Sequence, residues 1–145
     1  MNLFNGSLGP VDLTADVIGY FSGKGARFRA AGPARALNTV TGLGGAGVSV
    51  LPHAAAVLGL DHLPGFKGTQ RDVVLSVTVL DARANGSLSV FPDGAVPADP
   101  NILFRAGKPV TVQVIVPLTG PSIDFYNKSK GSIQILADVE GYTVH

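Results

Sequence analysis

The sequence has no cysteine, no tryptophan and few charged residues. The absence of cysteine excludes disulfides, thiolate metal sites and cysteine nucleophiles. Only 14% of the residues are charged, and the 11 Lys and Arg are balanced by 10 Asp and Glu without any run of one sign. Such a distribution provides no electrostatic footprint for nucleic acid or for a membrane surface. We therefore expect neither as a partner.

Long apolar runs are also absent. No stretch approaches the eighteen unbroken apolar residues that a membrane-spanning helix needs, so membrane insertion is not expected. The first apolar residues are interrupted at Asn5, Gly6, Gly9 and Pro10, and no Lys or Arg precedes them. This pattern predicts no signal peptide.

Turn-forming residues are abundant, with 19 Gly and 10 Pro in a chain of 145 residues. Short apolar segments separated by such residues predict an all-β fold, an antiparallel β-sandwich or a barrel-like module. The clearest segment is Asp72 to Leu80, whose period-2 pattern of β-branched residues predicts a central strand. Further strands are predicted at 87–91, 101–104, 110–117, 122–127 and 132–139.

Two local features need separate treatment. Asn85-Gly86 supplies the positive φ values of a tight turn, which predicts a hairpin between the strands on either side. The stretch from His53 to Leu60 is ambiguous, because Pro52 could open a helix there while the preceding "VSVLP" is typical of a strand.

The most informative feature is an internal repeat. Residues 3–20 align with residues 125–142 at a constant offset of 122, with eight identical pairs in eighteen positions. The identical pairs are Asn5/Asn127, Ser7/Ser129, Gly9/Gly131, Ala15/Ala137, Asp16/Asp138, Val17/Val139, Gly19/Gly141 and Tyr20/Tyr142. Each copy has an apolar pair, a loop of Asn, Ser and Gly, and a strand ending in "ADVxGY".

We interpret each copy as a β-hairpin, which is only marginally stable alone and must dock on something. The domains are then residues 1–21, an extra N-terminal hairpin, and residues 22–145, the module that carries the same hairpin at its end. The predicted docking residues are Leu3, Phe4, Val11, Leu13, Val17 and Tyr20 in the first copy, and Phe125, Tyr126, Ile133, Ile135, Val139 and Tyr142 in the second.

Polar and glycine positions of the repeat are predicted to form turns and caps. They are Asn5, Asp16 and Gly19 with their counterparts Asn127, Asp138 and Gly141. Asp16 and Asp138 could instead be the paired carboxylates of a glycosidase, but a carboxylate before "VxGY" is better explained by bonds to turn amides. No catalytic residue is therefore assigned.

The repeat leaves its docking geometry open. The N-terminal hairpin could pack beside its own module in cis, or it could complete a sheet edge of a neighbour in trans, as donor strands do in fibres. Residues 1–21 could also be the remnant of a longer array. Like modules are the expected partners in each case.

Several motifs together resemble a repeat found in large secreted or cell-wall proteins of actinobacteria. They are "ADVIGYF" and "ADVEGY", "FYNKSKG", "SVFPDG", "NILFRAGKPVTVQVIVPL" and "PARALNTVTGLGG". The resemblance covers about residues 33–142 and implies a tandem β-rich module without a defined activity, located outside the cell or in the cell wall. Where that family has Asp, Thr and Arg, this chain has Asn38, Thr39 and Val40. A binding role of those residues in the family would be missing here.

Two further patterns suggest a cofactor or a metal, and neither is adopted. "GLGGAG" at Gly42 to Gly47 matches a dinucleotide fingerprint, but "VSVLP" follows it where that motif requires a helix. His53, Asp61, His62 and His145 could ligate a metal, although a surface turn explains the first three better. No cofactor is expected.

The sequence thus predicts a non-catalytic structural or adhesive extracellular module that joins neighbouring units or chains through its repeated hairpin. The alternative is a carbohydrate- or cell-wall-binding module attached to a secreted enzyme, with cell-wall polysaccharide as the partner. The absence of Trp, with only three Tyr and seven Phe, weakens that alternative because such modules usually expose a row of aromatic rings.

Overall fold

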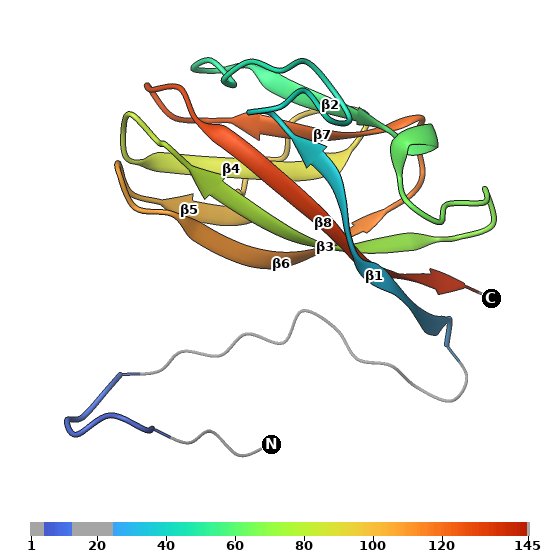
Figure 1. The fold of residues 1–145 in the computed structure, drawn as a ribbon, viewed down its shortest axis with the longest axis horizontal. Coiled ribbons are helices and arrows are strands. Elements are labelled where there is room, and N and C mark those ends of the chain that lie inside the picture. The colour runs from blue at the N-terminus through green and yellow to red at the C-terminus, as the bar shows by residue number, and fades with distance from the viewer. Residues whose placement is uncertain (1–4, 13–24, 145) are drawn as a thin grey trace.

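A computed structural model describes residues 5–12 and 25–144 of the chain. Residues 25–144 form an antiparallel β-sandwich of two four-stranded sheets (Figure 1). The elements are β1 (Arg27–Asn38), β2 (Ala55–Gly59), the 3-10 turn η1 (Leu60–His62), β3 (Asp72–Leu80), β4 (Gly86–Pro92), β5 (Ile102–Phe104), β6 (Val110–Pro117), β7 (Ser122–Asn127) and β8 (Gln134–Val144). The all-β sandwich expected from the sequence is confirmed.

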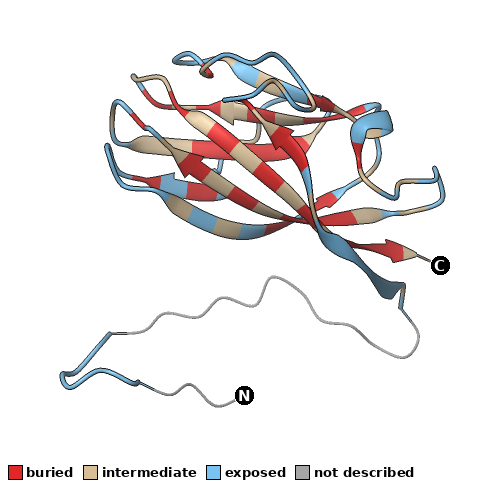
Figure 2. Cartoon of the chain, in the orientation of Figure 1, coloured by how far each residue is buried: buried red, intermediate tan, exposed pale blue. Residues whose placement is uncertain are grey.

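One sheet has the order β1-β8-β3-β6 and the other β2-β7-β4-β5. β3 lies inside its sheet, as its alternating pattern predicts, and pairs with both β6 and β8. Val73, Leu75, Val77 and Val79 point into the core and are fully buried. The buried residues of both sheets form one cluster between the layers (Figure 2).

The ambiguous stretch at His53 to Leu60 is largely strand, since β2 covers Ala55–Gly59 and η1 follows it. β2 is an edge strand that pairs with β7 only. Gly42 to Gly47 lies in the loop before it, where Gly42 and Gly44 have positive φ values of 86° and 73°. The described residues contain no α-helix after this loop, so the dinucleotide motif has no structural basis.

The predicted hairpin at Asn85-Gly86 is wrong, because β3 and β4 belong to different sheets. Gly86 does not have a positive φ. It is required by close packing, since a Cβ at this position would lie 2.2 Å from the Cβ of Ser129. The Asn85 side chain accepts a 2.9 Å hydrogen bond from the Ala106 N–H and so holds a loop that passes between sheets.

The same correction applies to the second copy of the repeat. β7 pairs with β2 and β4, whereas β8 pairs with β1 and β3. The copy at residues 125–142 is therefore a strand–turn–strand crossover between the two sheets, and the predicted hairpin is wrong. A repeat identifies a unit of sequence, but it does not reveal with which other strands its two strands pair.

Within the described residues, no helix has the length and apolar character needed to cross a membrane.

Candidate functional site

The turn of the second copy is built by two side chains and by backbone groups of residues that the repeat keeps. Asn127 Oδ1 accepts hydrogen bonds from the Ser129 N–H at 2.9 Å and from the Ser129 hydroxyl at 2.7 Å. Asn127 Nδ2 donates to the Gly131 carbonyl at 2.8 Å. Asn and Ser favour such local bonds to nearby backbone, so the sequence "NKSKG" closes its own turn.

The first copy forms the same network. Asn5 Oδ1 accepts from the Ser7 N–H at 2.9 Å and from the Ser7 hydroxyl at 2.8 Å. Asn5 Nδ2 donates to the Gly9 carbonyl at 2.8 Å. The Ser7 hydroxyl is also 2.8 Å from that carbonyl, as the Ser129 hydroxyl is 2.7 Å from the Gly131 carbonyl. The repeated residues therefore specify one turn structure twice.

The surroundings of the two turns differ. Asn127 is completely buried, and its Nδ2 also contacts the carbonyl oxygens of Val50 at 3.2 Å and Leu51 at 3.1 Å. Residues 5–12 are exposed throughout (Figure 2), and no atom lies within 4 Å of where a Cβ on Gly9 would be. One copy is thus docked in a sandwich, and the turn of the other is formed without such a partner among the described residues.

Five of the six predicted apolar positions of the second copy lie in the core, and Tyr126 does not. Phe125, Ile133, Ile135, Val139 and Tyr142 are buried, and Tyr126 is half-buried on the outer side of β7. In the first copy, Val11 is exposed over 50% of its surface. The other predicted docking, turn and cap residues of that copy lie outside the described residues; they are Leu3, Phe4, Leu13, Asp16, Val17, Gly19 and Tyr20.

A β-bulge within "ADVEGY" explains how Val139 and Tyr142 are both buried. Leu75 is opposite Val139 and Val74 is opposite Gly141, so Glu140 is an extra residue in β8. Strict alternation would place Val139 and Tyr142 on opposite faces of the sheet. A bulge places two residues opposite one, so the inserted residue shifts the in–out alternation of the side chains by one position. Val139 and Tyr142 therefore both face the core.

Asp138 does not cap a turn, contrary to the prediction. It lies within β8 on the outer face, opposite Arg35 of β1. Arg35 Nε and Nη2 donate to the two carboxylate oxygens at 2.5 and 3.1 Å. An exposed strand face favours such a cross-strand pair of opposite charges. The carboxylate is engaged in this ion pair, which also argues against a role in acid–base catalysis.

Gly141 is also not a turn residue. It lies inside β8, where an added Cβ would come within 2.4 Å of both the Arg29 carbonyl oxygen and the Phe28 ring. Both copies have glycine at this position. In the second copy, the absence of a side chain lets β1 and the Phe28 ring approach β8 closely.

Tyr142 anchors the end of β8. Its hydroxyl donates to the Pro64 carbonyl at 2.7 Å, and its ring lies 6.4 Å from the Phe66 ring. Burial raises the pKa of Tyr142 to about 12 because the phenolate would lose hydration. Tyr142, one of the predicted docking residues, therefore has a buried ring and a bonded hydroxyl.

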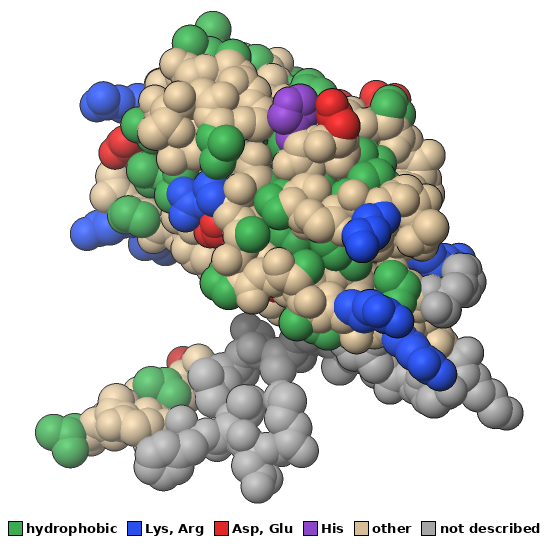
Figure 3. All heavy atoms as spheres, turned by 45° about the vertical axis from the view of Figure 1, so that its right-hand side comes forward, with side chains coloured by type: hydrophobic (Ala, Val, Ile, Leu, Met, Phe, Trp, Pro, Cys, Tyr) green, Lys and Arg blue, Asp and Glu red, His purple; other side chains and the backbone are tan. Residues whose placement is uncertain are grey.

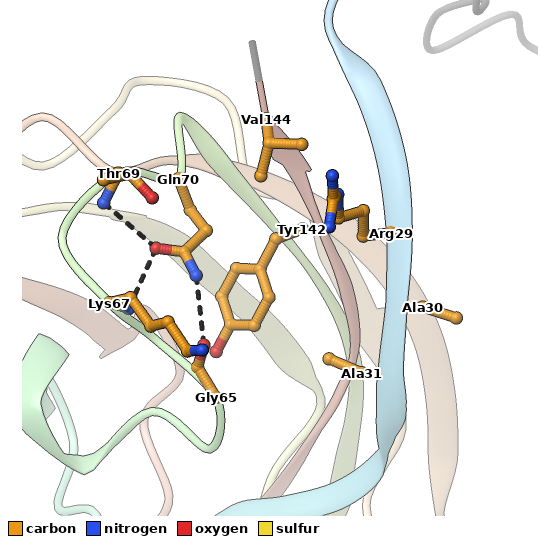
Figure 4. Close-up of a pocket in the computed structure, with 9 residues that line it drawn as sticks. All are labelled: Arg29, Ala30, Ala31, Gly65, Lys67, Thr69, Gln70, Tyr142 and Val144. Carbon is orange, nitrogen blue, oxygen red and sulfur yellow. Dashed lines mark hydrogen bonds between the residues drawn. The ribbon is translucent and has the colours of Figure 1, made fainter.

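A cleft of about 420 Å³ opens beside Tyr142, between β1 and the loop that precedes β3 (Figure 4). Arg29 and Lys67 contribute the only charged side chains among its lining residues, and neither forms an ion pair with a described residue. Gln70 braces the loop by accepting from the N–H groups of Lys67 and Thr69 and donating to the Gly65 carbonyl. The cleft is therefore a braced pocket with two cations and no carboxylate. The sequence alone does not reveal this cleft, because Arg29 and Lys67 lie 38 positions apart.

The Lys and Arg side chains visible in Figure 3 are spread over that face of the sandwich and form no single patch. On the same view, histidine and acidic side chains lie together at one point. Asp61 Oδ1 is 3.0 Å from His62 Nδ1. In the described residues, no group of three His, Cys, Asp or Glu is placed to hold a metal.

Asn38 and Thr39, which the predicted resemblance aligns with an Asp and a Thr, form local hydrogen bonds, whereas Val40, aligned with an Arg, does not bond through its side chain. Asn38 Oδ1 accepts from the N–H groups of Val40 and Thr41, and Thr39 is buried with its hydroxyl accepting from the Ile135 N–H at 2.9 Å. Val40 is exposed. The first two side chains stabilise the loop after β1 and the start of β8.

No protein-family model, no curated protein and no solved structure matches this chain. The resemblance to an actinobacterial repeat therefore stays a prediction from the motifs.

Proposed function

We propose that this chain is a non-catalytic structural or adhesive module that joins like modules through its repeated strand–turn–strand segment. The observation that supports the proposal is the shared hydrogen-bond network, which is buried around Asn127 and exposed around Asn5. A turn that forms before it docks reduces the ordering cost of binding. The first copy is thus a prepared docking element.

The second copy shows what such an element needs. Its β7 part lies between β2 and β4, and its β8 part lies between β1 and β3. These four strands form a slot, which we call the crossover slot. A like module has the same slot, which its own β7–β8 copy fills, so the first copy would dock in a neighbour by taking the place of that copy, in an array or a fibre. An extracellular or cell-wall location is proposed on the resemblance alone.

The experiment is a comparison of the intact chain with a variant lacking residues 1–21, by light scattering over a concentration series with electron microscopy of the same samples. Oligomers or filaments of the intact chain that disappear on truncation support the joint. The double variant Asn5→Ala/Ser7→Ala is the matched control, because it removes the turn network while keeping the chain length. Monomers of the intact chain at every concentration would argue against a joint between chains.

The cleft beside Tyr142 favours a second candidate function, the binding of an acidic cell-wall polysaccharide. Arg29 and Lys67 line it without a neighbouring carboxylate, and Thr69 adds a polar group (Figure 4). A sugar carboxylate or phosphate is the group that two such cations would recognise.

This second function is tested by titrating the chain with glucuronate and with neutral glucose while following amide chemical shifts. Binding of glucuronate that weakens about tenfold in Arg29→Gln and in Lys67→Gln supports it. Arg83→Gln, which changes a cation outside the lining, is the control. Equal shifts in all variants, or equal shifts with glucose, would contradict a specific anion site.

A further inference from the structure

The end of β8 lies beside the start of β1. The two strands are antiparallel, and Val144 is the residue opposite Arg27 (Figure 1). A strand in the β8 position therefore finishes where β1 begins. Antiparallel neighbours of this kind can be joined directly by a short loop.

The repeat places the end of the first copy close enough to β1 in the sequence for such a short loop. At the offset of 122, the counterpart of Val144 is Ser22, and only residues 23–26 separate Ser22 from Arg27. Their sequence is Gly-Lys-Gly-Ala. Four-residue loops are common between paired strands, and the two glycines tolerate the backbone angles that such turns demand.

We propose that the first copy and the β7–β8 copy are alternative occupants of one crossover slot within the same chain. In the alternative state, residues 1–22 fill the slot of their own module and residues 23–26 close a hairpin onto β1, while the β7–β8 copy is released. The proposal rests on the proposed function in one respect, the equivalence of the two copies as docking elements.

The contacts of the slot fit the first copy at the positions that the repeat keeps. Arg35 faces Asp138, whose counterpart is Asp16, and the Phe28 ring packs over Gly141, whose counterpart is Gly19. The Val50 and Leu51 carbonyl oxygens accept from Asn127, whose counterpart is Asn5. The first copy therefore keeps the carboxylate, the glycine and the amide that these three contacts use.

The positions that differ explain why β7–β8 is the resident copy. Lys128 Nζ donates to the carbonyl oxygens of Pro97 and Ala98, and its counterpart is Gly6. Gln134 Nε2 donates to the Ser49 hydroxyl at 2.9 Å, a bond that its counterpart Asp12 cannot donate. The resident copy therefore has contacts that the first copy lacks, and weakening it should shift the occupancy.

Because the chain has no cysteine, engineered cysteine pairs report the occupant without background. In the full chain, the pair Arg35→Cys/Asp138→Cys reports the resident copy, and the pair Arg35→Cys/Asp16→Cys reports the first copy. Paired residues on adjacent strands come within reach of a disulfide. Each pair is oxidised, and mass spectrometry distinguishes an intramolecular crosslink from an intermolecular one.

The resident copy is then weakened by Gly141→Val, whose side chain would clash with the Arg29 carbonyl and the Phe28 ring. We expect the intramolecular 16–35 crosslink to increase at least about tenfold in this background. Asn127→Ala is a milder second variant that should act in the same direction if Gly141→Val does not fold. Adding Gly19→Val should abolish the gain, because it introduces the same bulk into the first copy.

The possible outcomes separate this inference from the proposed function. An intramolecular 16–35 crosslink supports exchange within one chain. A 16–35 crosslink found only between chains overturns the inference but supports the joint between modules. Absence of both crosslinks in a chain that stays folded with weakened β7–β8 overturns the inference and contradicts the equivalence of the copies.

Discussion

The side-chain amide of Asn127 donates to the carbonyl oxygen of Val50, at 3.2 Å and across 77 positions of sequence. This bond connects the repeated turn with the loop before β2. It shows how a turn that is closed by its own residues is also held by the rest of the sandwich.

Asn127→Ala should destabilise the fold, whereas Asn5→Ala should not. The first change removes a fully buried amide that donates to the carbonyls of Val50, Leu51 and Gly131 and accepts from Ser129, and the loss of these hydrogen bonds costs about 1–3 kcal/mol. The second changes an exposed turn, and such substitutions stay within about 0.5 kcal/mol. Urea unfolding of both variants measures the difference; equal losses would contradict the assignment of a buried turn at Asn127 and an exposed turn at Asn5.

Gly141→Ala should lower the free energy of unfolding by about 1–3 kcal/mol, because the added methyl group overpacks the space beside Phe28 and the Arg29 carbonyl. Gly9→Ala is the comparison, since nothing lies within 4 Å of its new Cβ. Thermal unfolding of the two variants should show a loss for the first alone. An unchanged Gly141→Ala would mean that β1 and β8 are not packed as described.

The ion pair between Arg35 and Asp138 should contribute little. Both side chains are partly exposed, at 37% and 23% of their surfaces, and pairs of this kind contribute about 0.2–1 kcal/mol. A double-mutant cycle with Arg35→Gln and Asp138→Asn measures the coupling. We expect it to shrink in 1 M salt, where charges on a surface are screened; a coupling that is unaffected by salt would point to hydrogen bonding instead.

Alkaline pH should weaken the fold through Tyr142. Its pKa is raised from 10.0 to about 12 by burial, so the folded chain resists ionisation that the unfolded chain permits. The free energy of unfolding should therefore be unaffected by this group below pH 10 and should fall as the pH rises toward 12. Comparing unfolding of the parent and Tyr142→Phe between pH 8 and pH 11.5 isolates the effect, and an identical pH slope in the two proteins would exclude it.

The fold class and several strands could be predicted because they depend on local pattern. Asp72–Leu80 alternates β-branched residues and is an internal strand with those limits, and Ser122–Asn127 was also predicted with its limits. β1 could not be found in this way, because Arg27–Asn38 contains Gly and Pro and no β-branched residue. Its partner β8 provides the pairing that makes it a strand.

The candidate site could be predicted in composition but not in arrangement. The repeat identified the buried residues of the second copy, yet it could not show that β7 and β8 enter different sheets. Nor could it show that Glu140 is an extra residue, which turns Tyr142 inward, or that Asp138 lies opposite Arg35 of β1. These features depend on strands distant in sequence.

The most direct test of the docking role places an incomplete module before the first copy. Residues 23–122 are added ahead of Met1, which is the counterpart of residue 123, so that residues 1–22 follow them as β7–β8 follows β6 in the native module. Amide hydrogen exchange then counts the protected residues of the extended chain. We predict that the added unit folds and gains protection matching that of residues 23–122 in the parent, and that Gly19→Val removes this gain. An added unit that exchanges freely, beside a folded parent module, would contradict the claim that the first copy is a docking element for a like module.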